Sequence, residues 1–150
     1  MNRMRPPRAP RRQSGLSLIE VLIAVLIMAV GLLGIAALQA VTLRNSQSAL
    51  DRTQATVLSY AILDAMRANA TAARANSYNV GMTCTIPAAG ATLVSHDHNT
   101  WISSLKATMG DSACGSIACA SNVCTVTIRW NDSRASGGDA NETLTTTSRI

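Results

Sequence analysis

The sequence contains no phenylalanine, and its 150 residues include only two tryptophans and two tyrosines. The chain after residue 40 is rich in Ala, Thr, Ser and Asn. A domain of about 75 residues with this composition buries little apolar surface and is marginally stable on that basis alone. Small exported domains commonly compensate with disulfide bonds. With so few aromatic residues, the cysteines are the expected source of additional stability.

No C-x-x-C pair occurs among the four cysteines, which are Cys84, Cys114, Cys119 and Cys124. A structural zinc site would be expected to contain such pairs and to need a reducing compartment. We therefore predict disulfide bonds rather than zinc. Four cysteines allow three pairings, and the sequence does not choose among them.

His96 and His98 flank Asp97, a grouping that superficially suggests a metal site. Side chains adjacent in a helix cap do not converge on one ion without further ligands. We therefore predict solvated loop histidines, no metal and no cofactor. Asp97 is expected to cap a short helix over residues 99–109.

Catalytic groupings are also missing. We find no Ser-His-Asp order, no paired carboxylates and no glycine-rich phosphate loop, which predicts a protein that is not an enzyme. The net charge of +5 is misleading as a sign of nucleic-acid binding, because five of the thirteen Lys and Arg residues lie in residues 1–15. The other eight balance the eight Asp and Glu residues, so nucleic acid is not expected as a partner.

An uncharged apolar run occupies residues 21–38, VLIAVLIMAVGLLGIAAL. It is long enough to cross a bilayer as a helix. Five arginines and no acid precede it in residues 1–15, so this flank is predicted to be cytoplasmic and the C-terminal part to be exported. A secretory signal would be followed by a small-x-small cleavage site, which does not follow this run. The helix is therefore expected to stay with the mature protein.

Glu20 stands directly before this run, in the segment GLSLIEV at residues 15–21. With its basic leader, this segment resembles the class III signal of type IV pilins, which usually reads GFTLIEV. The following GLLGIAALQ resembles PilV-type minor pilins. The resemblance implies that a prepilin peptidase removes residues 1–15 by cutting between Gly15 and Leu16, and that Leu16 is then N-methylated. Glycine before the cut leaves the backbone unobstructed.

A carboxylate within a spanning helix is costly, by about 2.5–3.5 kcal/mol at the centre and less near the interface. Such a residue persists when it has a partner. The resemblance supplies one for Glu20, namely the new amino group of Leu16 in a neighbouring subunit. Pairing would offset both desolvation costs and fix the axial register of two helices. The alternative is that Glu20 lies in the headgroup layer.

The expected fold class is α+β and pilin-like. Apolar residues recur at three- and four-residue spacing beyond residue 39, so one helix is predicted over residues 16–74, with residues 21–38 in the membrane. Residues 75–150 should form a small disulfide-stabilised domain with an antiparallel sheet. Its clearest strand is residues 123–130, and the Thr-rich residues 142–150 should return as an antiparallel edge strand. Shorter extended pieces are expected near residues 82–86 and 91–94. Residues 131–141 should form a long polar loop.

The resemblance implies a minor pilin that helps to initiate or modify a bacterial type IV pilus. Its partners would be prepilin peptidase, other minor and major pilins, and inner-membrane lipid. It would cross the inner membrane once, with a periplasmic C-terminal domain, and then join the fibre or its tip. A minor pseudopilin of a type II secretion system is one alternative. Another is an adhesin or DNA-uptake pilin, for which Arg129 and Arg134 are the obvious contact residues.

Overall fold

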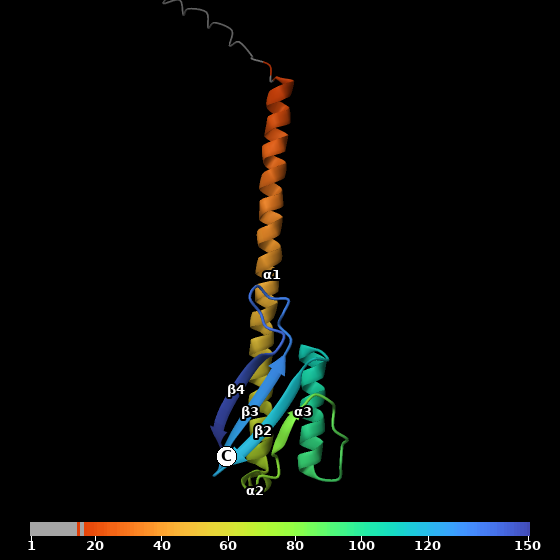
Figure 1. Ribbon diagram of the computed structural model, residues 1–150, viewed down its shortest axis with the longest axis vertical. Helices are drawn as coiled ribbons and strands as arrows, with labels where there is room; N and C mark the ends of the chain where they lie inside the picture. The colour runs from red at the N-terminus through yellow and green to blue at the C-terminus, as the bar shows by residue number, and fades with distance from the viewer. Residues whose placement is uncertain (1–14, 16) are drawn as a thin grey trace, which may run out of the picture. The chain divides into compact units, whose positions relative to one another are not determined.

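The computed structural model describes residue 15 and residues 17–150. The chain divides into two units, Met1–Gln39 and Ala40–Ile150, and the boundary falls within the first helix. The elements are α1 (Leu18–Ala68), α2 (Ala70–Arg74), β1 (Val80–Thr83), α3 (Leu93–Met109), β2 (Cys114–Ala120), β3 (Val123–Trp130) and β4 (Glu142–Arg149) (Figure 1). A long apolar helix and a small antiparallel sheet confirm the predicted α+β, pilin-like class.

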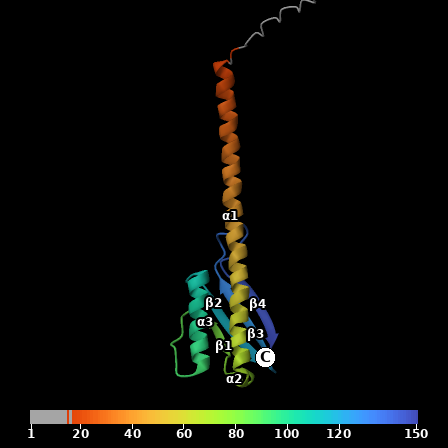
Figure 2. The same ribbon diagram turned by 180° about the vertical axis from the view of Figure 1, so that it is seen from behind.

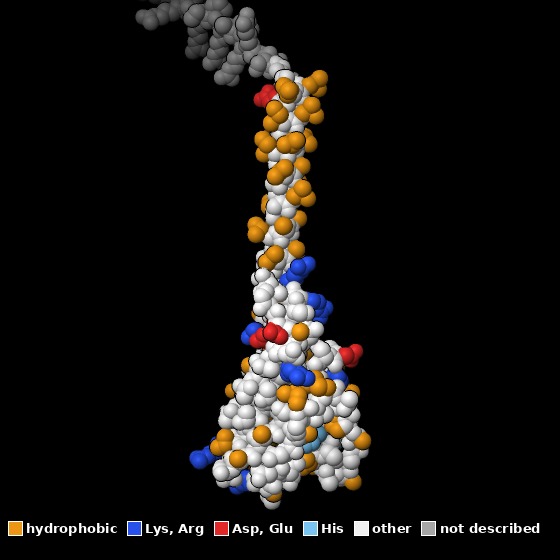
Figure 3. Space-filling view, in the orientation of Figure 1, with side chains coloured by type: hydrophobic (Ala, Val, Ile, Leu, Met, Phe, Trp, Pro, Cys, Tyr) orange, Lys and Arg blue, Asp and Glu red, His pale blue; other side chains and the backbone are white. Residues whose placement is uncertain are grey.

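In the first unit, the large apolar side chains of α1 are exposed, and those on one face of the helix are seen in Figure 3. The exposed fraction runs from 47% at Val21 to 85% at Leu18. Among the described residues, α1 is the one helix long and apolar enough to cross a membrane, and none of its most apolar segment is buried. Exposing this much apolar surface to water is unfavourable, so these side chains need lipid or other apolar helices around them.

The second unit contains a four-stranded antiparallel meander in the order β1-β2-β3-β4. A two-residue turn, Ser121-Asn122, joins β2 to β3. Both residues have positive φ, 50° and 66°, as a tight turn that matches the twist of a hairpin requires. Strand β4 pairs with β3 along its whole length. The predicted strand at residues 123–130 and the predicted antiparallel return at residues 142–150 are therefore confirmed.

The core of the second unit lies between one face of the sheet and the helices α1 and α3, which cover that same face (Figure 2). Alternate side chains of β3 point into this core. Its fully or nearly buried residues include Ile62, Leu63 and Met66 of α1, Trp101, Ile102 and Leu105 of α3, and Val126, Ile128 and Trp130 of β3. The Trp101 indole N–H donates to the Leu58 carbonyl, 3.1 Å away, and so joins α3 to α1. Position 115 has room only for glycine, because a Cβ there would lie 2.5 Å from the Trp101 ring.

The prediction of one unbroken helix to residue 74 is wrong. Asn69, with φ −116° and ψ 48°, interrupts the helix between α1 and α2. Its side-chain amide donates to the Tyr78 hydroxyl, 3.2 Å away. Asparagine readily leaves helical geometry when its side chain finds a local partner.

The prediction for residues 91–109 also needs correction. Helix α3 begins at Leu93, and its N-cap is Thr92, whose hydroxyl accepts a hydrogen bond from the Ser95 backbone N–H. Residues 93 and 94 are therefore helical rather than extended. Asp97 lies within the helix and does not cap it, and the two histidines beside it are helical rather than loop residues.

Asp97 instead accepts a hydrogen bond from Tyr78. The Tyr78 hydroxyl lies 2.5 Å from Asp97 Oδ2. The Tyr78 carbonyl lies 3.2 Å from His98 Nε2, and the two rings meet edge to face. Burial and the bond to Asp97 raise the pKa of Tyr78 to about 12. This network allows a fully buried tyrosine to keep its polar group satisfied.

Candidate functional site

The start of α1 carries the residues that the sequence associates with processing. Gly15 is exposed, and no heavy atom of a neighbouring element lies within 4 Å of a Cβ built on it. The Ser17 carbonyl accepts from the backbone N–H groups of Glu20 and Val21, at 3.0 and 3.3 Å, and so forms the first turn. Leu16, the predicted N-methylation residue, and residues 1–14 of the predicted leader lie outside the described residues.

Glu20 lies in the first turn of α1 and is exposed. A carboxylate is favourable at this end of a helix because it interacts with the positive end of the helix dipole. None of residues 21–43 is ionisable. Within the described residues up to position 43, Glu20 is thus the one charged side chain, and it lies beside a long apolar surface. Its pairing with the Leu16 amine of a neighbour stays a prediction.

The structure pairs Cys84 with Cys114 and Cys119 with Cys124. This selects one of the three pairings that the sequence left open. Cys119 and Cys124 face each other across the β2–β3 hairpin. The other bond ties the segment after β1 to the start of β2. Among the described residues, no group of three or more potential ligands could hold a metal ion.

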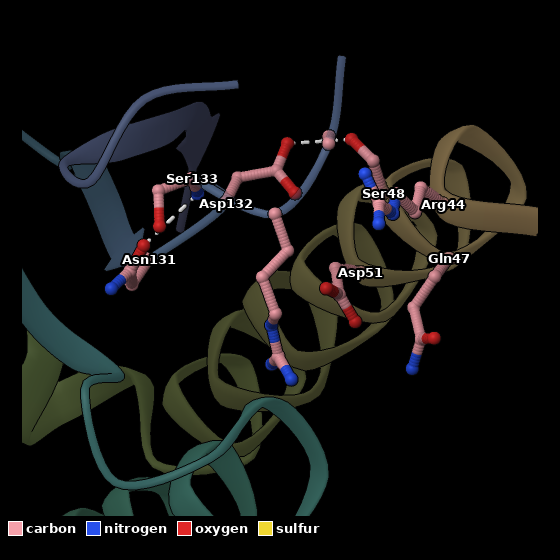
Figure 4. A pocket seen from close by; sticks show the side chains of 9 residues that line it. Arg44, Gln47, Ser48, Asp51, Asn131, Asp132 and Ser133 are labelled. Carbon is pink, nitrogen blue, oxygen red and sulfur yellow. Dashed lines mark hydrogen bonds between the residues drawn. The ribbon is translucent and has the colours of Figure 1, made fainter. Parts of the chain in front are cut away.

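A polar pocket of about 410 Å³ lies between α1 and the loop that joins β3 to β4 (Figure 4). Its lining residues are Arg44, Gln47, Ser48 and Asp51 of α1 and Asn131, Asp132, Ser133, Arg134 and Ala135 of the loop. The Ser48 hydroxyl donates to Asp132 Oδ2 at 2.5 Å. Asp132 is buried, so this bond replaces hydration that its carboxylate has lost.

Backbone hydrogen bonds hold this loop in place. The Asp132 N–H donates to the Asp139 carbonyl at 2.8 Å, and the Ser136 N–H donates to Asn45 Oδ1 on α1 at 3.3 Å. A Cβ on Gly138 would lie 2.0 Å from the Asp132 carbonyl oxygen, so only glycine fits. The hydrogen bonds beside the pocket thus fasten the loop to α1.

The two arginines considered as contact residues do not form one patch. Arg134 lines the polar pocket, where its charge acts on Asp51. Arg129 lies on β3, and its guanidinium Nη2 is 3.5 Å from the sulfur atoms of both Cys84 and Cys114. Sequence reasoning missed the role of Asp51 and Asp132, because their approach depends on the long connection between β3 and β4.

The charge of Asp51 should lower the stability of the second unit at neutral pH. Burial and the nearby Asp132 raise the pKa of Asp51 from 3.8, while Arg134 acts to lower it. With a raised pKa, the native state holds its proton to higher pH than the unfolded state, so the free energy of unfolding falls as pH rises through this window. Asp51→Asn should therefore raise Tm at pH 7, and the gain should vanish below about pH 4.

Thermal unfolding of the full chain in detergent at several pH values measures this effect. Asp64→Asn is the matched control, because Asp64 is exposed on the same helix and pairs with Arg67. It should give no gain. A Tm for Asp51→Asn that equals the wild-type value at pH 7 would show that Arg134 fully offsets the burial of Asp51.

Residues 10–36 match the model of the prokaryotic N-terminal methylation motif. No curated protein and no solved structure matches the chain. The motif contains Gly15, Glu20 and most of the apolar run, and it confirms the class III signal. It implies processing by a prepilin peptidase and association with other pilins, and it indicates a structural subunit rather than an enzyme. Together with the apolar helix and the α+β fold, the motif supports a membrane-anchored protein of the type IV pilin and pseudopilin kind.

Proposed function

We propose that the chain is a minor subunit of a bacterial type IV pilus that acts in the assembly or modification of the fibre. The N-terminal methylation motif at residues 10–36 is the observation that carries this proposal. The exposed apolar part of α1 supports it, since a helix of this kind requires lipid before assembly and other apolar helices afterwards. The PilV-like segment at residues 31–39 is the basis for the minor-pilin assignment.

In this proposal, the peptidase cuts between Gly15 and Leu16, and the amino group of Leu16 is methylated. The mature chain then waits in the inner membrane with residues 21–38 in lipid and the second unit in the periplasm. During assembly, the amine of one subunit pairs with Glu20 of another. This pairing replaces the headgroup and water contacts that both charges lose in an apolar fibre core.

A minor pseudopilin would carry the same processing signal and the same anchor. The two assignments differ in where the mature chain accumulates and in what its deletion removes. A minor pilin should be found in sheared fibres, and its deletion should reduce surface pili. Loss of protein secretion with normal pili would support the pseudopilin alternative.

Adhesion or DNA uptake is less well supported. Tyr78, Trp101 and Trp130 are buried, and only Tyr60 is half exposed among the four aromatic side chains. Single-stranded nucleic acids usually bind by stacking bases on exposed aromatic rings above a basic groove. The separation of Arg129 from Arg134 further weakens this alternative.

Leader removal tests the proposal most directly. Gly15→Ala should slow the cleavage and Gly15→Leu should stop it, because a side chain at this position obstructs the backbone that the peptidase must reach. Intact-mass measurement on the membrane fraction gives the cleavage position. Ser17→Ala is the matched control and should be processed normally. Cleavage after Ala37 or Ala40 would instead indicate an ordinary secretory signal.

A further inference from the structure

The two disulfides differ in how far they are exposed. Cys84 is exposed, whereas its partner Cys114 is buried. Cys119 and Cys124 are both buried, with exposed fractions of 7% and 1%. The backbone of Cys119 is also fixed by Asn79, whose side chain accepts from the Cys119 N–H at 2.7 Å. A soluble thiol can therefore approach the first disulfide from the side of Cys84, while the second is shielded.

The two disulfides also differ in their electrostatic surroundings. Arg129 and Cys114 are opposite residues of β3 and β2, and this register brings the guanidinium to the bond. Arg129 Nη2 lies 3.5 Å from both sulfur atoms. Within residues 15 and 17–150, no carboxylate lies at ion-pair distance from Arg129. Its positive charge is thus directed at the sulfurs without local neutralisation.

A cation beside a cysteine stabilises the thiolate, which is the form released when a disulfide is attacked. Stabilising the reduced form makes a disulfide easier to reduce. We propose that Cys84–Cys114 is a site of thiol–disulfide exchange with an external dithiol, and that Arg129 is the positioning residue that favours its opening. The proposal does not depend on fibre assembly.

The exchange consists of two displacements. A thiolate of the dithiol attacks the exposed Cys84 sulfur, a mixed disulfide forms, and the Cys84–Cys114 bond breaks. Cys114 leaves as a thiolate beside Arg129. The second thiolate of the dithiol then attacks the dithiol's other sulfur atom, which is bonded to Cys84 in the mixed disulfide, and Cys84 is released as a thiolate. Two electrons have passed to the cysteine pair, and the dithiol has become a disulfide. The protons lost by its two thiols are taken up by water or by the released cysteines.

Reduction at this site would free a limited part of the chain. The disulfide fastens the segment between β1 and α3 to β2. That segment is also held by the Asn99 side-chain amide, which donates to the Pro87 carbonyl at 2.6 Å. The β2–β3 hairpin keeps its own disulfide. The consequence is a loosened segment on an intact sheet.

The test uses the full chain in detergent, equilibrated at pH 7 in buffers with increasing ratios of reduced to oxidised dithiothreitol. Acid quenching, alkylation and peptide mass mapping then report each cysteine separately. Cys84 and Cys114 should become half reduced at a ratio at least tenfold lower than Cys119 and Cys124, a difference of about 30 mV for a two-electron couple. Simultaneous reduction of both pairs, or earlier reduction of Cys119–Cys124, would overturn the proposal.

Substitution of the arginine separates its role from simple exposure. Arg129→Gln should raise the ratio of reduced to oxidised dithiothreitol that half reduces Cys84–Cys114 by about three- to tenfold. Arg129→Lys keeps the charge and should stay close to the wild type. Arg149→Gln, on the same face of the sheet, is the control. An unchanged ratio in Arg129→Gln would remove Arg129 from the proposal.

A second measurement needs no variant. Iodoacetamide labels Cys84 and Cys114 of the reduced wild-type protein, and free glutathione is labelled in parallel as a reference thiol. Salt at 1 M should slow the labelling of the two cysteines several-fold more than that of glutathione, because screening weakens the attraction between Arg129 and the thiolates. An equal salt effect on protein and glutathione would contradict thiolate stabilisation.

Discussion

Replacing Glu20 with alanine should leave leader removal and membrane insertion intact and should exclude the chain from the fibre. The change leaves residues 21–38 as they are and removes the charge that precedes them, so anchoring in the membrane persists. In the fibre, however, the Leu16 amine of the neighbouring subunit would lose its partner in an apolar core. Breaking a buried ion pair from one side costs about 3–5 kcal/mol, whereas an interfacial carboxylate would contribute less than about 1 kcal/mol. Incorporation should therefore fall at least a hundredfold.

The measurement is the amount of variant in sheared pili divided by the amount in membranes. Ser17→Ala alters the same helical turn without removing a charge and should behave as wild type. Glu20→Gln keeps the size of the side chain and should fail as alanine does, because it cannot neutralise the amine. A normal ratio for Glu20→Ala would place Glu20 in the headgroup layer and end the pairing mechanism.

The sequence predicted best the parts of the fold whose signal is local. The apolar run and the alternation at residues 123–130 depend on the spacing of neighbouring residues, and both are found in α1 and β3. Strand β2 was missed, because CGSIACA combines small residues that have little preference for strands. Its place is set by pairing with β3 and by the room that Gly115 leaves for Trp101.

The cap of α3 was assigned to the wrong residue for a related reason. Both Thr92 and Asp97 are residue types found at N-caps, and the sequence alone gives a preference for aspartate. Asp97 instead accepts a hydrogen bond from the hydroxyl of Tyr78, which lies nineteen positions earlier in the chain. Tertiary hydrogen bonds of this kind are invisible to local patterns.

The candidate site divides in the same way. Gly15 and Glu20 could be named because the processing signal is a contiguous segment, and the match at residues 10–36 covers it. The disulfide pairing, the approach of Asp51 to Asp132 and the contact of Arg129 with sulfur all depend on strand register and loop path. No spacing of residues along the chain predicts those contacts.

The disulfides should contribute unequally to the stability of the second unit. In the chain-entropy model, the stabilisation by a crosslink has a constant part and a part that grows with the logarithm of the length of the loop that it closes. The sequence separations are 30 residues for Cys84–Cys114 and 5 for Cys119–Cys124. These correspond to about 3.6 and about 2 kcal/mol. Small domains are stable by about 5–15 kcal/mol, so either loss is large.

We therefore expect the paired substitution of Cys84 and Cys114 by alanine to lower the urea midpoint more than the paired substitution of Cys119 and Cys124. Trp101 and Trp130 are both buried in the second unit and are the only tryptophans, so their fluorescence reports its unfolding in detergent-solubilised full chain. Removal of all four cysteines should cost about 6 kcal/mol and leave the unit largely unfolded at 25 °C if its stability is near the low end of the usual range. A larger loss from the short hairpin crosslink would mean that packing around the buried Cys119–Cys124 bond outweighs loop entropy.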